Sequence, residues 1–130
     1  MPSFRFTIPS QPISVNHAYQ VIRVKTKEGS QRRLGKIPGV ENYQIVAATM
    51  ARRALARFLT DEGPDFPLDQ QVQVRYWIRS RRGVDASNVI KIAEDGIAAG
   101  LGINDKWFLP CVVENSKGHK EPHIEVEVAW

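Results

Sequence analysis

The 130 residues suffice for one domain with one hydrophobic core and are too few for two ordinary domains. Apolar residues make up 42% and charged residues 25%, as in soluble globular proteins, and no apolar run approaches the roughly 20 residues that span a bilayer. The first residues lack the apolar stretch of a secretory signal. We therefore expect a single domain over residues 1–130, located in the cytoplasm.

The formal net charge of +4 is unevenly distributed. Residues 1–60 carry ten Arg or Lys against two acidic residues, a net charge of +8, which leaves −4 for residues 61–130. A basic half joined to an acidic half is typical of a surface for a polyanion beside a carboxylate-bearing site. Many basic proteins bind no nucleic acid, so charge alone leaves binding of DNA or RNA and its absence equally open.

The N-terminal third begins with alternating apolar and polar residues. This alternation predicts a strand over residues 4–8 with one buried face, which Pro9 and Pro12 end because proline cannot donate to a sheet ladder. Residues 20–25 fit a second, shorter strand. Residues 26–40 combine Lys, Arg, Gly, Ser and Pro without periodicity, so we expect a basic surface loop there.

An amphipathic helix is predicted over residues 42–59 and is stopped at residues 61–64. Its apolar positions recur at steps of three and four residues: Ile45, Ala48, Ala51, Leu55 and Leu59. Arg52, Arg53 and Arg57 fall on or near its solvated side.

The C-terminal half alternates strands and helices. Residues 72–78 predict a central strand, and residues 87–99 predict a helix that the glycines of residues 100–102 end. Strands follow over residues 109–115 and 124–128. We expect an α+β domain with one mixed or antiparallel sheet and two main helices packed on it.

Cys111 is the only cysteine and cannot form an internal disulfide. It lies among the apolar residues 109–113, which favours a buried, unreactive thiol.

The segment between the central strand and the second helix contains Asp85, Ser87 and Asn88. All three residue types cap helix N-termini, so helix capping alone explains one of them. Three within four positions exceed what a cap needs, and loops between rigid elements often carry function.

Further polar residues follow along the predicted helix. Ser87, Lys91 and Asp95 recur at four-residue steps and so line one side of it. An exposed Lys91–Asp95 pair, of little energetic value, is the simplest explanation. Asp105 lies in a turn before the next strand and could approach Asp85 if that strand pairs beside the central one.

Converging carboxylates suit a hard cation. Magnesium prefers oxygen ligands and often takes only one or two carboxylates from a protein. Zinc would require paired His or Cys, whereas His17, His119, His123 and Cys111 show no such spacing. No motif surrounds a serine or cysteine nucleophile, and the sequence contains no glycine-rich phosphate loop.

At these residues the sequence resembles the RusA family of Holliday-junction resolvases, and the resemblance covers nearly the whole chain. One matching segment stands near the N-terminus as Ile8, Pro9, then Pro12, Ser14, Asn16 and Tyr19. The central motif stands as Arg82, Asp85, Ser87, Asn88 and Lys91, then Asp95, Gly96 and Ile97, then Asn104 and Asp105. Together the two segments are fairly specific.

The resemblance implies a RusA-like endonuclease that resolves four-way DNA junctions by paired symmetric nicks in recombination and repair. Asp85 and Asp105 match magnesium ligands, with manganese as a possible substitute, and Lys91 matches a lysine that stabilises phosphate charge. Ser87 and Asp95 are further candidate ligands. We expect the Asp85 and Asp105 carboxylates to lie within about 6 Å of each other. The family also implies a homodimer in a bacterial or phage-infected cell.

The remaining candidate residues would bind DNA or support the site. The DNA-binding candidates are Arg32, Arg33, Arg52, Arg53, Arg81 and Arg82. The candidates for structural roles near the active-site edge or dimer interface are Pro12, Ser14, Asn16, Tyr19 and Asn88. For the arginines of the first helix, a merely solvated helix face is an equal alternative.

Three positions depart from the family pattern: Ser87 and Asn104 replace aspartates, and Trp107 replaces a glutamine. The first two changes remove two negative charges from the expected site. The alternatives are therefore a weakly active or inactive junction-binding protein, a nuclease for other branched or flapped DNA, and a structural or protein-interaction domain.

Overall fold

The computed structural model describes residues 1–14, 19–26, 29–36, 38–61, 63 and 65–130, and of residues 19–26, 29–36 and 38 it describes the backbone alone. The elements in chain order are β1 (Ser3–Pro9), β2 (Tyr19–Thr26), β3 (Gly29–Lys36), α1 (Pro38–Asp61), β4 (Val72–Arg79), α2 (Ala86–Leu101), the short 3-10 helix η2 (Asp105–Trp107), β5 (Phe108–Ser116) and β6 (His123–Ala129).

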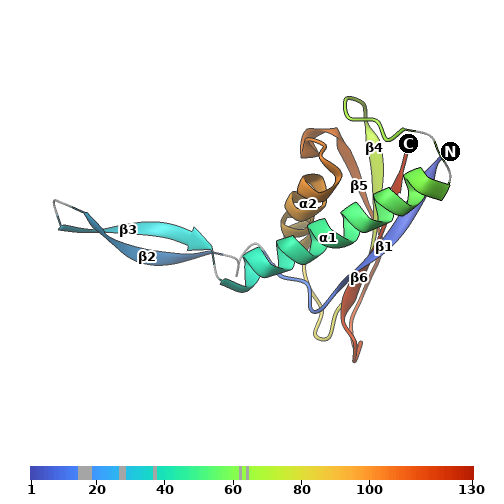
Figure 1. The fold of residues 1–130 in the computed structure, drawn as a ribbon. Helices are drawn as coiled ribbons and strands as arrows, with labels where there is room; N and C mark the ends of the chain where they lie inside the picture. Colours follow the sequence, from blue (N-terminus) through green and yellow to red (C-terminus); the bar gives the residue numbers. More distant parts are fainter. Residues whose placement is uncertain (15–18, 27–28, 37, 62, 64) are drawn as a thin grey trace.

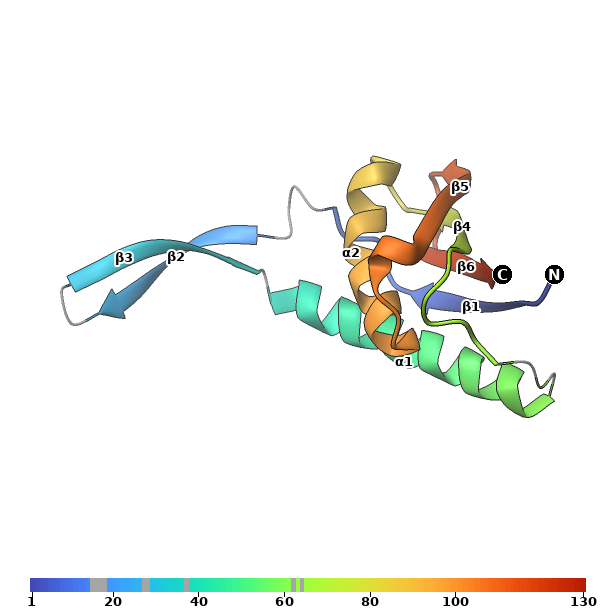
Figure 2. The same cartoon turned by 90° about the horizontal axis from the view of Figure 1, so that it is seen from above.

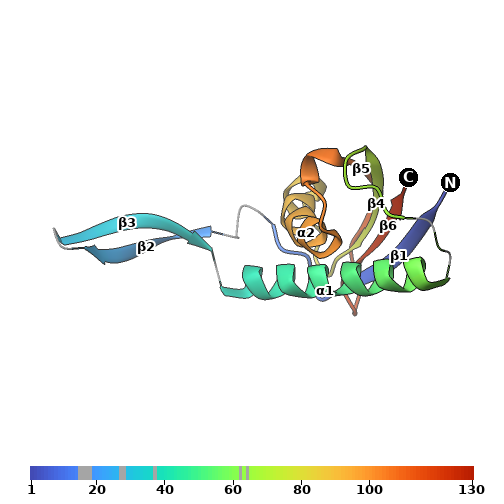
Figure 3. The same ribbon diagram turned by 45° about the horizontal axis from the view of Figure 1, so that its top comes forward.

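The main sheet has four strands in the order β1-β6-β4-β5. β6 pairs antiparallel with β1 and β4, whereas β4 and β5 are parallel and are connected through α2. Both helices lie on the same side of this sheet (Figures 1 and 3). The expected α+β domain with a mixed sheet and two main helices is therefore confirmed.

The core lies between the helices and one face of the sheet. Alternation along β1, β4 and β6 buries every second side chain, as the sequence pattern predicts, and Ala129 at the end of β6 is buried in addition. The sheet side chains in this layer are Phe4, Phe6, Ile8, Val72, Val74, Tyr76, Ile78, Ile124, Val126 and Val128.

Helix α1 extends beyond the predicted residues 42–59 at both ends, and its buried face matches the expected one only in part: Ala51 is buried and Leu55 packs against the core. Ile45 is 63% exposed and Leu59 is 39% exposed. The buried positions are Val40, Tyr43, Ala47, Ala51 and Phe58. The two sets share Ala51 and both recur at helical spacing, and burial of the large aromatic side chains Tyr43 and Phe58 sets which face turns inward. Arg52, Arg53 and Arg57 are exposed, as expected.

The two helices cross in close contact because α2 carries glycine at the crossing. A Cβ atom built on Gly96 would lie 2.7 Å from the Gln44 carbonyl oxygen and 2.9 Å from the Ala47 Cβ. A Cβ on Gly100 would collide with the backbone of Ala48. Gln44 also donates from Nε2 to the Ile92 carbonyl oxygen at 3.1 Å, which joins the helices by a hydrogen bond.

The predicted basic loop over residues 26–40 is wrong in part. β3 pairs antiparallel with β2 along the full length of both strands, from Tyr19 opposite Lys36 to Thr26 opposite Gly29. Charge and glycine hide the strand in the sequence, because its residues show no alternation of apolar and polar types. The hairpin extends away from the body of the domain (Figures 1 and 2).

Strand β5 forms one edge of the sheet and is largely exposed. Cys111 on this strand is exposed, so the expectation of a buried thiol is wrong. The apolar context of Cys111 reflects the composition of an uncovered edge rather than a core position. Among the described residues, no helix has the length and apolar character needed to cross a membrane.

Candidate active site

The loop that joins β4 to α2 is fixed by hydrogen bonds to the turn between β5 and β6. The Ser80 backbone N–H donates to the Ser116 carbonyl at 2.9 Å, and the Gly118 N–H donates to the Arg81 carbonyl at 3.0 Å. Gly83 adopts a φ of 89°, which favours glycine, and its N–H donates to the Ser80 hydroxyl at 3.0 Å. The loop therefore has a defined path to the start of α2.

Two side chains from other elements complete this support. Gln11 accepts a 3.0 Å hydrogen bond from the Arg81 backbone N–H through Oε1. Asn115 on β5 donates from Nδ2 to the Val84 carbonyl at 3.0 Å. Because Val84 precedes Asp85 directly, the edge strand helps to set where Asp85 stands.

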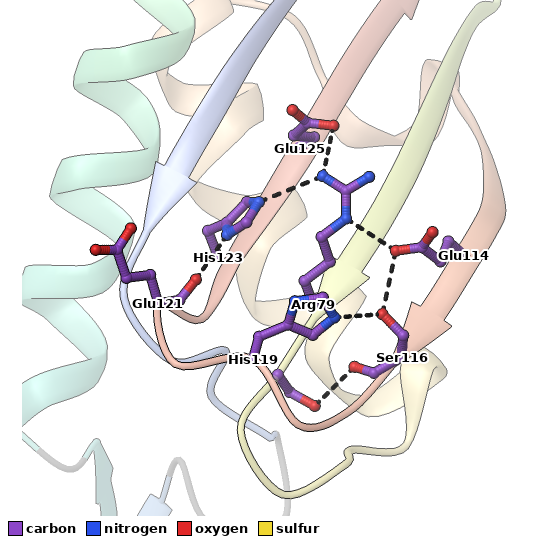
Figure 4. Close-up of polar contacts among 8 residues, drawn as sticks. Arg79, Glu114, Ser116, His119, Glu121, His123 and Glu125 are labelled. Atoms are coloured by element: carbon purple, nitrogen blue, oxygen red, sulfur yellow. Dashed lines mark hydrogen bonds and ion pairs between the residues drawn. The ribbon is translucent and has the colours of Figure 1, made fainter.

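A polar network on the face of the sheet away from the helices joins the ends of β4 and β5 to the start of β6 (Figure 4). Arg79 Nε donates to Glu114 at 2.8 Å, and Arg79 Nη1 lies 2.9 Å from Glu125. The hydrogen bond from Arg79 holds the pKa of the Glu114 carboxyl below its usual value. His123 donates from Nδ1 to the Glu121 carbonyl, so its Nε2 can accept from Arg79 at 3.4 Å. The network anchors β4 where the loop to Asp85 departs.

Asp85 is the N-cap of α2. Its Oδ1 accepts hydrogen bonds from the Ser87 backbone N–H at 3.1 Å and from the Ser87 hydroxyl at 2.8 Å. The capping explanation is thus correct for Asp85, and Ser87 acts as its donor. Both bonds fall on the same carboxylate oxygen, and Asp85 remains exposed.

Asp85 also lines a cavity of about 450 Å³ together with residues of the N-terminal motif. The walls are Pro12, Ile13, Ser14, Gly83, Val84, Asp85 and Asn88. Pro12 and Ser14 therefore lie beside Asp85, and their role at an active-site edge stays a prediction. Asn16 lies outside the described residues, and the Tyr19 side chain is likewise not described.

A second acidic group combines Glu94 and Asp95, near the middle of α2, with Asp105 in η2. Burial, followed by the negative charges of Asp105 and Asp95, raises the pKa of Glu94 to about 7. Glu94 Oε1 is buried without a hydrogen-bond partner among the described residues, and so are the hydroxyls of Tyr43 and Tyr76. Asp95 and Asp105 thus act on the same carboxyl group.

Asp85 and Asp105 do not come together within one chain. Asp85 precedes the first turn of α2, and Asp105 follows its C-cap, Gly102. The 16 residues of α2 span roughly 24 Å, and three residues beyond Gly102 can return by about 10 Å at most. The expected approach to about 6 Å is therefore not met in a single chain. Across the described residues, no three His, Cys, Asp or Glu side chains gather at one point to hold a metal.

The departures from the resolvase pattern have local structural roles. Asn104 caps η2 by accepting a 2.9 Å hydrogen bond from the Lys106 N–H, as an aspartate there would. Trp107 packs against the core, and the Lys106 ammonium lies 5.1 Å from the centre of its ring. Lys91 is exposed on α2.

The candidate DNA-binding arginines occupy three separate regions. Arg81 and Arg82 are exposed and line a cavity of about 480 Å³ with Ser10, Gln11 and Pro122. Arg52 and Arg53 are exposed on α1, and Arg32 and Arg33 stand on β3 of the projecting hairpin.

Sequence reasoning missed Gln11, Glu94 and Asn115. Gln11 and Asn115 act through tertiary hydrogen bonds that leave no local pattern. Glu94 left a weak signal, because it follows Lys91 by three residues on the predicted helix and so lies near it, as an ordinary surface ion pair would.

One comparison with known proteins identifies a relationship. The family model described as endodeoxyribonuclease RusA matches residues 23–129, which is nearly the whole chain. A search of curated proteins found no match. The matched residues include β3, both helices, the loop that carries Asp85 and the edge strand.

Proposed function

Because the chain belongs to the RusA family of endodeoxyribonucleases, which act on DNA junctions, we propose that it is a magnesium-dependent nuclease that resolves four-way junctions by paired, symmetric nicks. We assign it to DNA recombination and repair in the cytoplasm of a bacterial or phage-infected cell. The observation that carries the proposal is the placement of Asp85, an exposed carboxylate at a helix N-terminus that lines a cavity on a rigid loop.

The residues around Asp85 suit a magnesium ion. Both hydrogen bonds from Ser87 fall on Oδ1, which leaves Oδ2 to bind a cation. One or two carboxylates and several waters meet the usual requirement of magnesium in proteins. Bound there, the ion would lower the pKa of a water and neutralise charge on a phosphate.

The neighbouring side chains would orient this carboxylate and the DNA. Ser87 holds Asp85 in place by its 2.8 Å hydrogen bond. Lys91 lies four residues after Ser87 on an exposed side of α2, where its positive charge would stabilise a phosphate. Arg81 and Arg82, on the loop before Asp85, would bind the flanking DNA backbone.

The second carboxylate, Asp105, would come from another copy of the chain. Since α2 separates Asp85 from Asp105 in one chain, a shared ion requires two chains. A two-fold axis perpendicular to α2 would bring the Asp85 end of one helix beside the Asp105 end of the other. We therefore propose a homodimer with two equivalent sites, which suits a junction of near two-fold symmetry.

Cleavage of a synthetic four-way junction tests this function. Junctions labelled on each strand in turn are incubated with protein in Mg²⁺, Mn²⁺ or EDTA, beside a linear duplex and a flapped duplex. We expect nicks at symmetric positions in two opposing strands of the junction, and only with a divalent cation.

The matched variant is Asp85→Asn, which keeps the size and capping ability of the side chain. It should retain junction binding and lose cleavage. Preferred cleavage of the flapped duplex would instead identify a different branched substrate. Metal-independent binding without cleavage by the unaltered protein would identify a junction-binding protein.

A further inference from the structure

The edge strand β5 presents an apolar surface that nothing in the described chain covers. Leu109 is 50%, Val112 is 38% and Val113 is 51% exposed, and Pro110 and Cys111 between them are exposed as well. These five consecutive residues, 109–113, form what we call the β5 strip. They are uncharged, although the chain as a whole carries a net charge of +4.

The opposite edge of the sheet is built differently. On β1 the apolar side chains are buried, and the exposed residues include Ser3, Arg5 and Thr7. Arg5 is paired with Glu127 at 3.0 Å. Natural proteins protect free sheet edges with charge or cover them, and contiguous exposed apolar residues usually mark an interface. The β5 strip is thus the edge that requires a partner.

We propose that the β5 strip is the surface through which two copies of this chain associate, antiparallel about a two-fold axis close to Cys111. This inference rests on the homodimer of the proposed function and names the surface that forms it. It also states which residues of the two copies face each other.

Charge and shape favour a second copy of the chain as the partner. With the axis at Cys111, Leu109 of one copy faces Val113 of the other, and Pro110 faces Val112. The same relation sets Asp105 of one copy opposite Lys117 of the other, so opposite charges meet beyond the apolar residues. Two chains of equal net charge repel at long range, and an uncharged strip flanked by complementary charges permits close approach.

The position of β5 relative to the candidate site supports the same arrangement. Asp105 stands three residues before β5, in η2. Near the other end of β5, Asn115 donates to the Val84 carbonyl beside Asp85, and the Lys117 side chain lies against Gly83. Antiparallel β5 strands would therefore bring Asp105 of one copy to the Asp85 loop of the other.

Proline limits the kind of contact. Pro110 has no N–H, so it interrupts any continuous hydrogen-bonded ladder across the strip. Side-chain packing of Leu109, Val112 and Val113 is therefore the main contact that the strip offers.

Cys111 permits a direct test because it is the only cysteine in the chain. A short bis-maleimide is added to the full-length protein at a concentration where sedimentation shows a dimer. We expect covalent dimers with the unaltered chain and none with Cys111→Ser. The matched control moves the thiol to the exposed Thr7 on the other edge, as Cys111→Ser/Thr7→Cys, and should not cross-link.

A charge-pair rescue tests the facing residues. Leu109→Lys and Val113→Asp should each weaken self-association by about tenfold or more, because an unpaired charge must be desolvated. The double variant Leu109→Lys/Val113→Asp should regain much of the loss, since each introduced lysine lies opposite an introduced carboxylate of the other copy. Both positions are half exposed, so unfolding temperatures should confirm that each variant is folded.

The proposal and the nuclease function can fail separately. A stable dimer that does not cross-link through Cys111 and tolerates both single variants would overturn the β5 interface and leave the nuclease function intact. A monomer under all conditions that still cleaves junctions would also overturn it. A dimer that cross-links and is rescued as described, but does not cut DNA, would support the interface and contradict the proposed activity.

Discussion

The Ser87 hydroxyl donates a 2.8 Å hydrogen bond to Oδ1 of Asp85, the residue that caps α2. The serine that departs from the family pattern thus holds the one candidate ligand presented by a rigid loop. A second aspartate at residue 87 would instead place like charges side by side until a cation binds. This contact connects the departure to a measurable property, the proposed magnesium requirement.

We expect Ser87→Asp to lower the magnesium concentration needed for half-maximal cleavage, because a second carboxylate offsets more of the charge of the cation. Ser87→Ala should weaken cleavage modestly, since Asp85 loses a donor that orients it. Magnesium titrations of junction cleavage measure both effects. Ser3→Asp, which adds the same charge on β1, is the control and should leave the midpoint unchanged. An unchanged midpoint for both Ser87 variants would restrict Ser87 to a structural role.

Glu94 should make stability depend on pH. Its pKa is raised from 4.5 to about 7 in the folded chain, mainly by burial. The stability linked to its protonated form is complete below pH 4.5 and is lost as the pH rises through 7. In urea unfolding with EDTA, the free energy of unfolding of Glu94→Gln should therefore rise relative to that of the unaltered protein between pH 5 and pH 8. Glu121→Gln, at an exposed turn, is the control. A constant difference across this range would contradict the assignment.

The glycine at the helix crossing should resist substitution. Gly96→Ala places a Cβ 2.7 Å from the Gln44 carbonyl oxygen, which forces the helices apart and should cost about 1–3 kcal/mol of unfolding free energy. Gly39→Ala in α1 meets nothing within 4 Å and should be neutral or stabilising by up to about 1 kcal/mol. Chemical denaturation of the two variants gives both values. Equal stabilities would show that the helices can separate without cost.

The β2–β3 hairpin should contribute to DNA affinity through phosphate contacts. Its strands carry five basic residues and no acidic residue, namely Arg23, Lys25, Arg32, Arg33 and Lys36. In register Arg23 stands opposite Arg32, a pairing of like charges that a polyanion would relieve.

Arg32→Ala/Arg33→Ala should therefore lower the slope of log affinity against log salt by up to about 1.8, because each phosphate contributes about 0.9. Arg52→Ala/Arg53→Ala tests in parallel whether the exposed face of α1 also contacts DNA. Arg5→Ala, whose guanidinium is already paired with Glu127, controls for loss of a charge. The measurement is DNA affinity from low to physiological salt. An unaltered slope for the hairpin variant would show that the hairpin is not part of the DNA-binding surface.

Secondary structure could be predicted from the sequence where the apolar residues that repeat with a regular period are also the buried ones. Alternation predicted β1, β4 and β6, and Gly102 with a φ of 71° ends α2 where a glycine was expected. The buried face of α1 was not predictable, because Ile45 and Tyr43 lie on competing faces with the same spacing. β3 was missed because pairing with β2 sustains a strand that has no apolar face of its own.

The sequence allowed a prediction of which residues form the candidate site, but not of how they are arranged in space. The loop and cap of Asp85 follow from local pattern, whereas the cavity that Asp85 shares with Pro12 is visible only in the structure. The separation of Asp85 from Asp105 depends on the length of α2 and on the parallel pairing of β4 with β5. The hydrogen bonds of Gln11 and Asn115 join residues far apart in the chain, which no local pattern reveals.

Mixing two inactive variants tests most directly whether Asp85 and Asp105 act together at a site shared by two chains. Asp85→Asn and Asp105→Asn are purified separately, shown to bind the four-way junction without cutting it, and then mixed under conditions that exchange subunits. The mixed dimer contains one site with both aspartates, so junction nicking in Mg²⁺ should reappear. A mixture that exchanges subunits, binds the junction and remains inactive would contradict the shared site.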